Sequence, residues 1–188
     1  APADSVAKYV GGRVCRPDDK VCFYLKIHQI ISQKELSEHD KELNERFSSE
    51  DSVLMDFVLR KYPKAERKSS GLFVLKTTST DGTKAEFGKT VLVNYTVCDT
   101  TGKMLDTNVK DQALKGKIHN PSQIYQPFEF ILGDDGLIAG WTEGVSYMHK
   151  GEKCRILIPS KLAYGEGGFG AIAPFTPLIF DLELIDVK

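Results

Sequence analysis

Aromatic and aliphatic side chains, rather than acids, bases or metal ligands, are the residues of this chain most able to build a functional site. Six aromatic residues lie in or beside predicted strands and helices of the C-terminal part: Tyr95, Phe128, Phe130, Trp141, Tyr164 and Phe180. Aromatic residues on strands most often form the core. They can also line a dry pocket that holds its ligand with few polar groups. The sequence pattern leaves both alternatives open.

The polar residues show no arrangement typical of hydrolytic, dinucleotide or metal chemistry. Gly165 to Gly170 matches G-x-G-x-x-G, but Pro174 and Pro177 follow too closely for the helix that a dinucleotide site requires. No Ser/His/Asp or Cys/His set lies in a recognisable local signature. The four histidines lack ligand spacing. We therefore expect no metal and no cofactor, and we expect 165–170 to form a loop.

Two of the four cysteines could form a local disulfide. Cys15 and Cys22 flank a turn-prone stretch, so a bridge between them and a pair of free thiols remain alternatives. The pairing state of Cys98 and Cys154 is also left open.

Composition narrows the class of partner. The chain has 188 residues, a formal net charge of −1 and 41% hydrophobic residues, enough to bury a core. Near-zero charge excludes the basic footprint of a nucleic-acid binder. No apolar run approaches the roughly 18 residues of a membrane span. What remains is a globular protein that acts on a small molecule or another protein.

The first 70 residues have a different pattern from the rest. From Val21 to Ile31 the apolar residues fit a strand and a helix equally well. Ser32 and Glu35 form a capping box, in which each side chain satisfies a free backbone N–H group of the other, so a helix should begin there. This polar helix carries a thin apolar stripe of Leu36, Leu43 and Phe47.

A second helix is predicted to begin near Ser48 or Ser49. Its apolar face carries Val53, Leu54, Phe57 and Val58. It should end before Pro63, which lacks a backbone donor and disfavours helix in the preceding residue. The polar stretch 65–70 is predicted to be a linker.

Beyond residue 70 the pattern is mainly β. Strands are predicted over 72–77, 90–98, 128–132, 154–158 and 178–187. One helix fits Ile138 to Met148, and another fits Lys110 to Lys117. Several strands without a βαβ alternation favour an α+β fold with an antiparallel sheet.

Residues 71–187 resemble the FKBP-type peptidyl-prolyl cis/trans isomerases, the macrolide-binding family. Two runs match the family patterns P-F-x-F-x-L-G and V-I-x-G-W-x-E-G-V, and five others fit in family order. The seven runs are Gly71 to Val74, Val91 to Thr96, Lys103 to Thr107, Pro127 to Gly133, Leu137 to Val145, Ala163 to Gly165 with Ile172 to Pro174, and Leu178 to Leu184. Seven ordered motifs are far more specific than any one of them.

The resemblance implies a half-barrel of five or six antiparallel strands wrapped on a short helix. This isomerase domain would cover residues 71–188, with an insertion at about 107–126. A smaller, mostly helical segment over residues 1–70 would precede it, with no assigned role.

The resemblance also implies the site. The residues expected to be catalytic are Tyr95, Asp106, Ile138, Tyr164 and Phe180. The residues expected to bind substrate are Leu105, Phe128, Phe130, Leu137, Trp141 and Ile172. In that picture Trp141 is the floor of the pocket. The backbone N–H of Ile138 and the hydroxyl of Tyr164 donate to substrate carbonyls.

The implied activity is rotation about X–Pro bonds in protein segments. Resonance holds that bond planar with a barrier of about 18–20 kcal/mol and puts partial charge on the amide, so a dry pocket favours the twisted amide. No nucleophile, base or metal is needed. The alternative is a non-catalytic peptide-binding or chaperone module that uses the same pocket or the N-terminal segment.

Three departures from the family pattern bear on the site. Leu105 stands where the family usually has a phenylalanine, which alters the surface offered to a macrolide. The basic residue that would orient Asp106 has no clear match. The 107–126 stretch is longer than in compact members and could place a helix beside the pocket or form only a decorated loop.

The join from Ser69 to Phe73 resembles that of cell-envelope FKBPs of Gram-negative bacteria, which carry a helical N-terminal segment. This resemblance implies an extracytoplasmic protein in the periplasm or cell envelope, with or without a lipid anchor. In those members the segment often serves dimerisation or chaperone function, which implies a candidate homodimer here. The FKBP resemblance of residues 71–187 implies proline-containing or unfolded protein segments as partners and macrolides as candidate inhibitors. The resemblance to cell-envelope members also suits a Cys15–Cys22 bridge.

Overall fold

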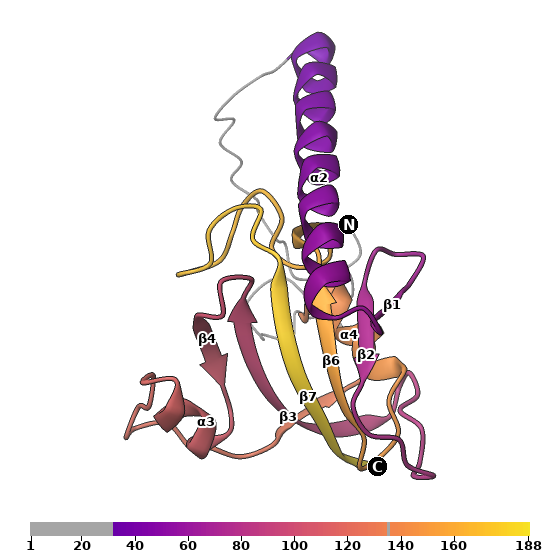
Figure 1. Ribbon diagram of the computed structural model, residues 1–188, viewed down its shortest axis with the longest axis vertical. Helices are drawn as coiled ribbons and strands as arrows, with labels where there is room; N and C mark the ends of the chain where they lie inside the picture. The colour runs from indigo at the N-terminus through magenta and orange to yellow at the C-terminus, as the bar shows by residue number, and fades with distance from the viewer. Residues whose placement is uncertain (1–31, 135) are drawn as a thin grey trace, which may run out of the picture. The chain divides into compact units, whose positions relative to one another are not determined.

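The computed structural model describes residues 32–134 and 136–188 (Figure 1). The predictions for Val21 to Ile31 and for a Cys15–Cys22 bridge lie outside these ranges. Within them, Cys98 and Cys154 are free thiols. None of the helices in the described ranges is both long enough and apolar enough to cross a membrane.

The first described element is a single long helix, α2 (Gln33–Lys61). It begins at the predicted capping box, where the Ser32 N–H donates to Glu35 Oε2 at 2.7 Å and the Glu35 N–H donates to Ser32 Oγ at 3.2 Å. The Ser32 hydroxyl also donates to Glu35 Oε2 at 2.8 Å, and the two hydrogen bonds that this carboxylate accepts from Ser32, from its N–H and from its hydroxyl, lower the pKa of Glu35. The helix ends before Pro63, as expected.

The predicted break near Ser48 and Ser49 is wrong, because the helix runs through it. The Ser48 hydroxyl donates to the Asn44 carbonyl at 2.8 Å, and the Ser52 hydroxyl donates to the Ser48 carbonyl at 3.0 Å. Serine satisfied in this way is tolerated inside a helix. The serines that suggested an N-cap are therefore interior residues of α2.

A seven-stranded antiparallel sheet forms most of the remainder. Its strands are β1 (Glu66–Arg67), β2 (Phe73–Lys76), β3 (Thr90–Asp99), β4 (Met104–Thr107), β5 (Phe128–Ile131), β6 (Lys153–Ile158) and β7 (Leu178–Val187). The order across the sheet is β1-β2-β6-β7-β3-β4, and β5 also pairs with β3. The α+β class and the antiparallel sheet are confirmed. The sheet has more strands than expected for two reasons. Strand β4 pairs with β3, and the short strand β1, which lies in the stretch predicted to be a linker, pairs with β2.

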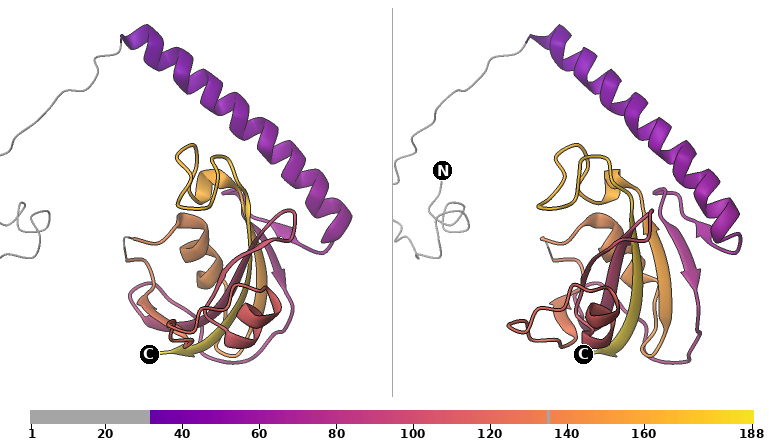
Figure 2. Two further views of the ribbon diagram at one scale, coloured as in Figure 1. Left: turned by 90° about the vertical axis from the view of Figure 1, so that its left-hand side faces the viewer. Right: turned by 60° about the vertical axis from the view of Figure 1, so that its left-hand side comes forward.

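Two short α-helices accompany the sheet, α3 (Lys110–Lys115) and α4 (Ala139–Ser146), both at predicted positions. Figure 2 shows α4 inside the curve of the sheet. Its buried residues Trp141 and Val145 join the main core with the inner side chains of β3, β6 and β7. Gly140 and Gly144 allow this approach, because a Cβ atom on either would collide with an isoleucine side chain of β6.

The other face of the sheet packs against α2. Leu54 and Val58, both 2% exposed, form a second core with three sheet residues: Phe73, Leu157 and Ile179. Arg67 of β1 adds a polar tie, since its guanidinium contacts both carboxylate oxygens of Asp51 at 2.7 and 2.8 Å. The C-terminal half of α2 is thus part of the domain's packing.

Candidate functional site

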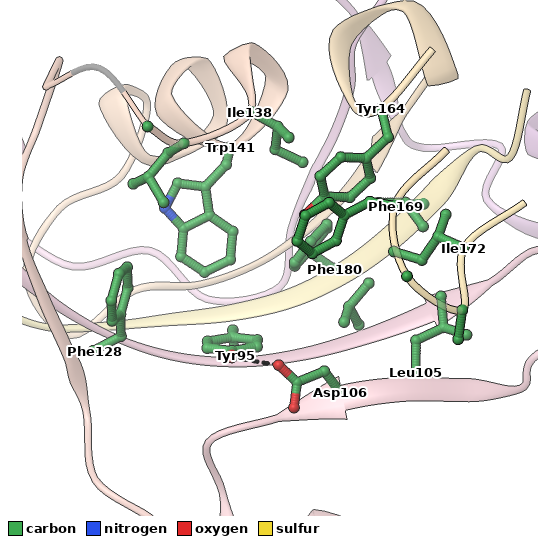
Figure 3. Close-up of a pocket in the computed structure, with 16 residues that line it drawn as sticks. Tyr95, Leu105, Asp106, Phe128, Ile138, Trp141, Tyr164, Phe169, Ile172 and Phe180 are labelled. Atoms are coloured by element: carbon green, nitrogen blue, oxygen red, sulfur yellow. Dashed lines mark hydrogen bonds between the residues drawn. The ribbon is translucent and has the colours of Figure 1, made fainter. Parts of the chain in front are cut away.

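An open cavity of about 460 Å³ lies between α4, the concave face of the sheet and the 159–177 connection from β6 to β7 (Figure 3). Most of its lining is aromatic or aliphatic. The lining residues are Tyr95, Val97, Leu105, Asp106, Phe128, Gly136, Leu137, Ile138, Trp141, Tyr164, Phe169, Gly170, Ala171, Ile172, Leu178 and Phe180. The single carboxylate among them is Asp106.

Three aromatic rings form the floor. The Trp141 ring meets the Tyr95 ring edge-on, with centroids 5.3 Å apart, and meets the Phe180 ring in the same way at 5.1 Å. Trp141 is 5% exposed and Phe180 7% exposed. Perpendicular contacts of this kind fix ring orientation, because the positive edge of one ring faces the negative face of another. The floor is therefore rigid and apolar.

Tyr95 and Asp106 provide the polar corner. The Tyr95 hydroxyl donates to Asp106 Oδ2 at 2.7 Å, and the Thr107 N–H donates to Asp106 Oδ1 at 2.7 Å. Burial, followed by the nearby Asp106 carboxylate, raises the pKa of Tyr95 well above its usual value. The carboxylate for which the sequence offered no basic partner is thus oriented by a tyrosine and a backbone amide.

The 159–177 connection forms the opposite wall. The Tyr164 ring stacks on the Phe169 ring with centroids 4.9 Å apart and planes 14° from parallel. Burial, with a contribution from Asp106, raises the pKa of Tyr164. Phe169 and Ile172 exchange backbone hydrogen bonds of 2.9 and 2.8 Å. As predicted, the G-x-G-x-x-G run forms a loop, and this turn brings its Phe169 to the cavity.

Ten of the eleven residues predicted for the site line this cavity. The exception is Phe130, which packs behind the lining residues. Its ring stacks on the Phe128 ring with centroids 5.3 Å apart, and its centroid lies 6.1 Å from that of the Trp141 ring. Six lining residues were not predicted: Val97, Gly136, Phe169, Gly170, Ala171 and Leu178. Strand alternation could have found two of them, since Val97 follows Tyr95, and Leu178 precedes Phe180, by two residues.

The insertion contributes a neighbouring groove rather than the cavity itself. The groove is about 540 Å³, shares Tyr95 and Phe128 with the cavity, and includes the exposed Ile124. The buried Asn108 side chain secures it: Oδ1 accepts from the Tyr95 N–H at 2.7 Å, and Nδ2 donates to the carbonyls of Val93 and Gln126 at 2.9 and 3.1 Å.

A sequence model of the FKBP-type peptidyl-prolyl cis-trans isomerases matches residues 81–185, more than half of the chain. The chain belongs to this family. Its main cavity lies within the matched residues and is lined by all the site residues that the FKBP resemblance implied except Phe130.

Bacterial FKBPs are among the similar proteins. FkpA of Escherichia coli (strain K12) is 34% identical over 148 residues, which cover 79% of this chain and 45% of that protein. FkpA of Buchnera aphidicola is 31% identical over 166 residues, covering 85% and 63%. The chain thus spans about half the length of the curated relatives it matches.

Solved structures show the same fold. The crystal structure of Escherichia coli FkpA is 30% identical with a TM-score of 0.60, covering 81% of this chain and 64% of that chain. A peptidyl-prolyl cis-trans isomerase from Pseudomonas syringae pv. tomato is also 30% identical, with a TM-score of 0.59, and covers 77% and 95%.

Proposed function

We propose that this FKBP-type chain is a peptidyl-prolyl cis/trans isomerase that acts on proline-containing protein segments. The observation that supports this most directly is the 460 Å³ cavity, whose floor is the perpendicular arrangement of Trp141, Tyr95 and Phe180. A proline ring is apolar and fits such a floor, whereas the cavity's few polar groups suit the adjoining amides.

The reaction forms and breaks no covalent bond, so catalysis reduces to binding the twisted amide better than the planar one. Twisting removes amide resonance and its charge separation, and a dry site destabilises the charge-separated planar form relative to the twisted one. Each 1.36 kcal/mol of this preference gives about a tenfold rate increase. The apolar lining therefore suffices as the main catalytic device.

Polar groups at the rim orient the peptide in this proposal. The backbone N–H of Ile138, at the start of α4, and the Tyr164 hydroxyl donate to substrate carbonyls. Asp106, held by Tyr95, faces the amide from the other side of the cavity. Phe180 and Phe128 enclose the proline, and Leu105, Leu137 and Ile172 complete the apolar wall.

The test is isomerisation of a short X–Pro peptide by the full chain. We expect acceleration above buffer, a loss of about tenfold or more in kcat/KM for Trp141→Ala, and a loss for Asp106→Val. Macrolide inhibition would test the pocket independently. A folded wild-type chain that gives no acceleration would contradict catalysis. Peptide binding without acceleration would then support the alternative, a non-catalytic peptide-binding or chaperone module. Leu105 and the insertion are the features of the chain that favour that alternative.

We also propose that the protein works outside the cytoplasm and pairs through its N-terminal segment. Support for the location is the Ser69 to Phe73 join and the likeness to bacterial FkpA. Support for pairing is the apolar surface of α2, where Val53 is 68% and Leu59 62% exposed. Cell fractionation tests the first. Sedimentation of the full chain against its Val53→Glu/Leu59→Glu variant tests the second, and a monomeric wild-type chain would exclude it.

A further inference from the structure

The connection between β6 and β7 has two sides with different neighbours. One side carries Tyr164, Phe169 and Ile172 into the cavity. The other side contacts the middle of α2, more than 100 residues earlier in the sequence. Figure 1 draws this connection in orange and yellow beside the indigo helix. A helix with no residue in the cavity is therefore attached to the cavity's wall.

Glu50 makes the strongest attachment. Its carboxylate accepts the Ser160 N–H at 2.7 Å and also accepts the Ser160 hydroxyl in a short hydrogen bond. Ser160 is only 1% exposed, so water cannot replace the carboxylate at either donor without rearrangement. Hydrogen bonds to a charged acceptor are stronger than neutral ones, and buried donors are costly to leave unpaired.

Ser160 passes this constraint to Tyr164. The Ser160 carbonyl accepts the N–H of Ala163 at 2.9 Å and the N–H of Gly165 at 2.8 Å. These two amides flank Tyr164 on either side. The backbone that carries the Tyr164 ring is thus fixed to the residue that Glu50 holds.

A second contact lies one helical turn earlier on α2. The Phe47 ring packs on Phe175 with centroids 5.4 Å apart, and the Arg46 guanidinium lies 5.3 Å from the centre of the same Phe175 ring. The Phe175 N–H donates to the Gly165 carbonyl at 2.8 Å. Both contacts therefore converge on the residues around Tyr164, from residue 160 and from residue 175.

We propose that Glu50 is a positioning residue for the cavity, and that α2 sets the place of Tyr164 through Ser160. The proposal rests on the proposed isomerase function for its kinetic consequence, but not for the contact itself. It assigns α2 a part in peptide binding although none of its side chains reaches the substrate.

A double-mutant cycle in the full chain tests the kinetic consequence. Glu50→Ala should lower kcat/KM for an X–Pro peptide about fivefold, the equivalent of one hydrogen bond at the substrate. In a Tyr164→Phe background, which already lacks that hydroxyl, Glu50→Ala should have almost no further effect. Glu50→Gln, which keeps one acceptor, should recover part of the loss. Glu45→Ala, an exposed glutamate on the same helix, is the matched control.

Amide hydrogen exchange keeps the inference testable apart from catalysis. Glu50→Ala or Phe47→Leu should speed exchange at Ala163 and Gly165 while exchange in β3 and β7 stays as in wild type. If the chain accelerates no isomerisation, the proposed function fails but this readout still decides the contact. Unchanged exchange at both amides would overturn the proposal, as would an equal loss of kcat/KM in the Tyr164→Phe background.

Discussion

The raised pKa of the Tyr95 hydroxyl makes the free energy of unfolding depend on pH. In the unfolded chain tyrosine loses its proton near pH 10, whereas in the folded chain burial and Asp106 keep the Tyr95 proton bound to higher pH. Below pH 10 Tyr95 is protonated in both the folded and the unfolded state, so its full contribution to stability is present. Above it the unfolded chain binds fewer protons than the folded one, so the free energy of unfolding falls as pH rises.

We expect the free energy of unfolding to decline above about pH 10, and we expect Tyr95→Phe to flatten the decline. The variant should also lose about 1 kcal/mol at neutral pH with its hydrogen bond to Asp106. Urea unfolding at several alkaline pH values, followed by Trp141 fluorescence, measures both. The same slope in wild type and variant would show that other groups control the alkaline limit.

At the scale of single residues, sequence motifs predicted the lining of the cavity better than residue types alone could. Trp141 and Phe180 are both buried core residues and cavity lining, so no pattern of hydrophobicity separates the two roles. Ordered motifs made the distinction. Phe169 was missed because its loop has no periodicity, and its place depends on a local turn closed by hydrogen bonds with Ile172.

Among the elements, the insertion depends on one side chain. Asn108 is 8% exposed and joins the start and end of the insertion to β3. Asn108→Ala should cost roughly 2–4 kcal/mol, since it leaves several buried backbone groups without partners. Asn108→Asp should be at least as damaging, because a carboxylate cannot donate to the two carbonyls. Denaturant unfolding measures this loss, and the exposed Asn120→Ala should stay within about 0.5 kcal/mol of wild type.

The close approach of α4 to β6 gives a second prediction at this scale. A Cβ atom on Gly144 would lie 2.6 Å from Ile156 Cδ1, closer than real Cβ atoms approach. Gly144→Ala gains about 1 kcal/mol of helix propensity but overpacks the core by about 1–3 kcal/mol, so we expect net destabilisation.

Ile156→Val removes the colliding Cδ1 atom. The double variant should therefore lose less free energy of unfolding than the sum of the losses in the two single variants. Thermal or urea unfolding of the four proteins measures this coupling. Additive losses would show that the helix shifts away from the strand instead of clashing with it.

Element prediction succeeded where periodicity or capping was strong and failed where tertiary contacts decided. The ends of α2 followed from a capping box and a proline. Its middle did not, because Ser48 bonds back to Asn44 instead of capping a new helix. The two-residue strand β1 has no pattern of its own and forms because Glu66 and Arg67 pair with Val74 and Phe73 of β2.

For the whole molecule, the second core is the decisive packing feature, because the C-terminal half of α2 and the sheet both contribute side chains to it. Figure 2 places α2 and α4 on opposite faces of the sheet, and Leu54 and Val58 are as buried as residues of the main core. The sequence predicted an apolar face on this helix but not what it covers, because an amphipathic pattern does not identify its partner.

A shared core implies that α2 and the sheet unfold together. Leu54→Ala should therefore lower the free energy of their joint unfolding by about 2–5 kcal/mol, because it leaves a cavity between α2 and the sheet. Leu36→Ala makes the same change on the same helix at a residue 46% exposed, and should stay within about 0.5 kcal/mol of wild type. Far-UV circular dichroism reports the helix and fluorescence of Trp141, the single tryptophan, reports the cavity. The two signals should move to the same lower urea midpoint in Leu54→Ala. A Trp141 midpoint that stays at its wild-type value while helical signal is lost earlier would show that α2 is an independent unit, and would also remove the rigid support through which Glu50 is proposed to hold Tyr164.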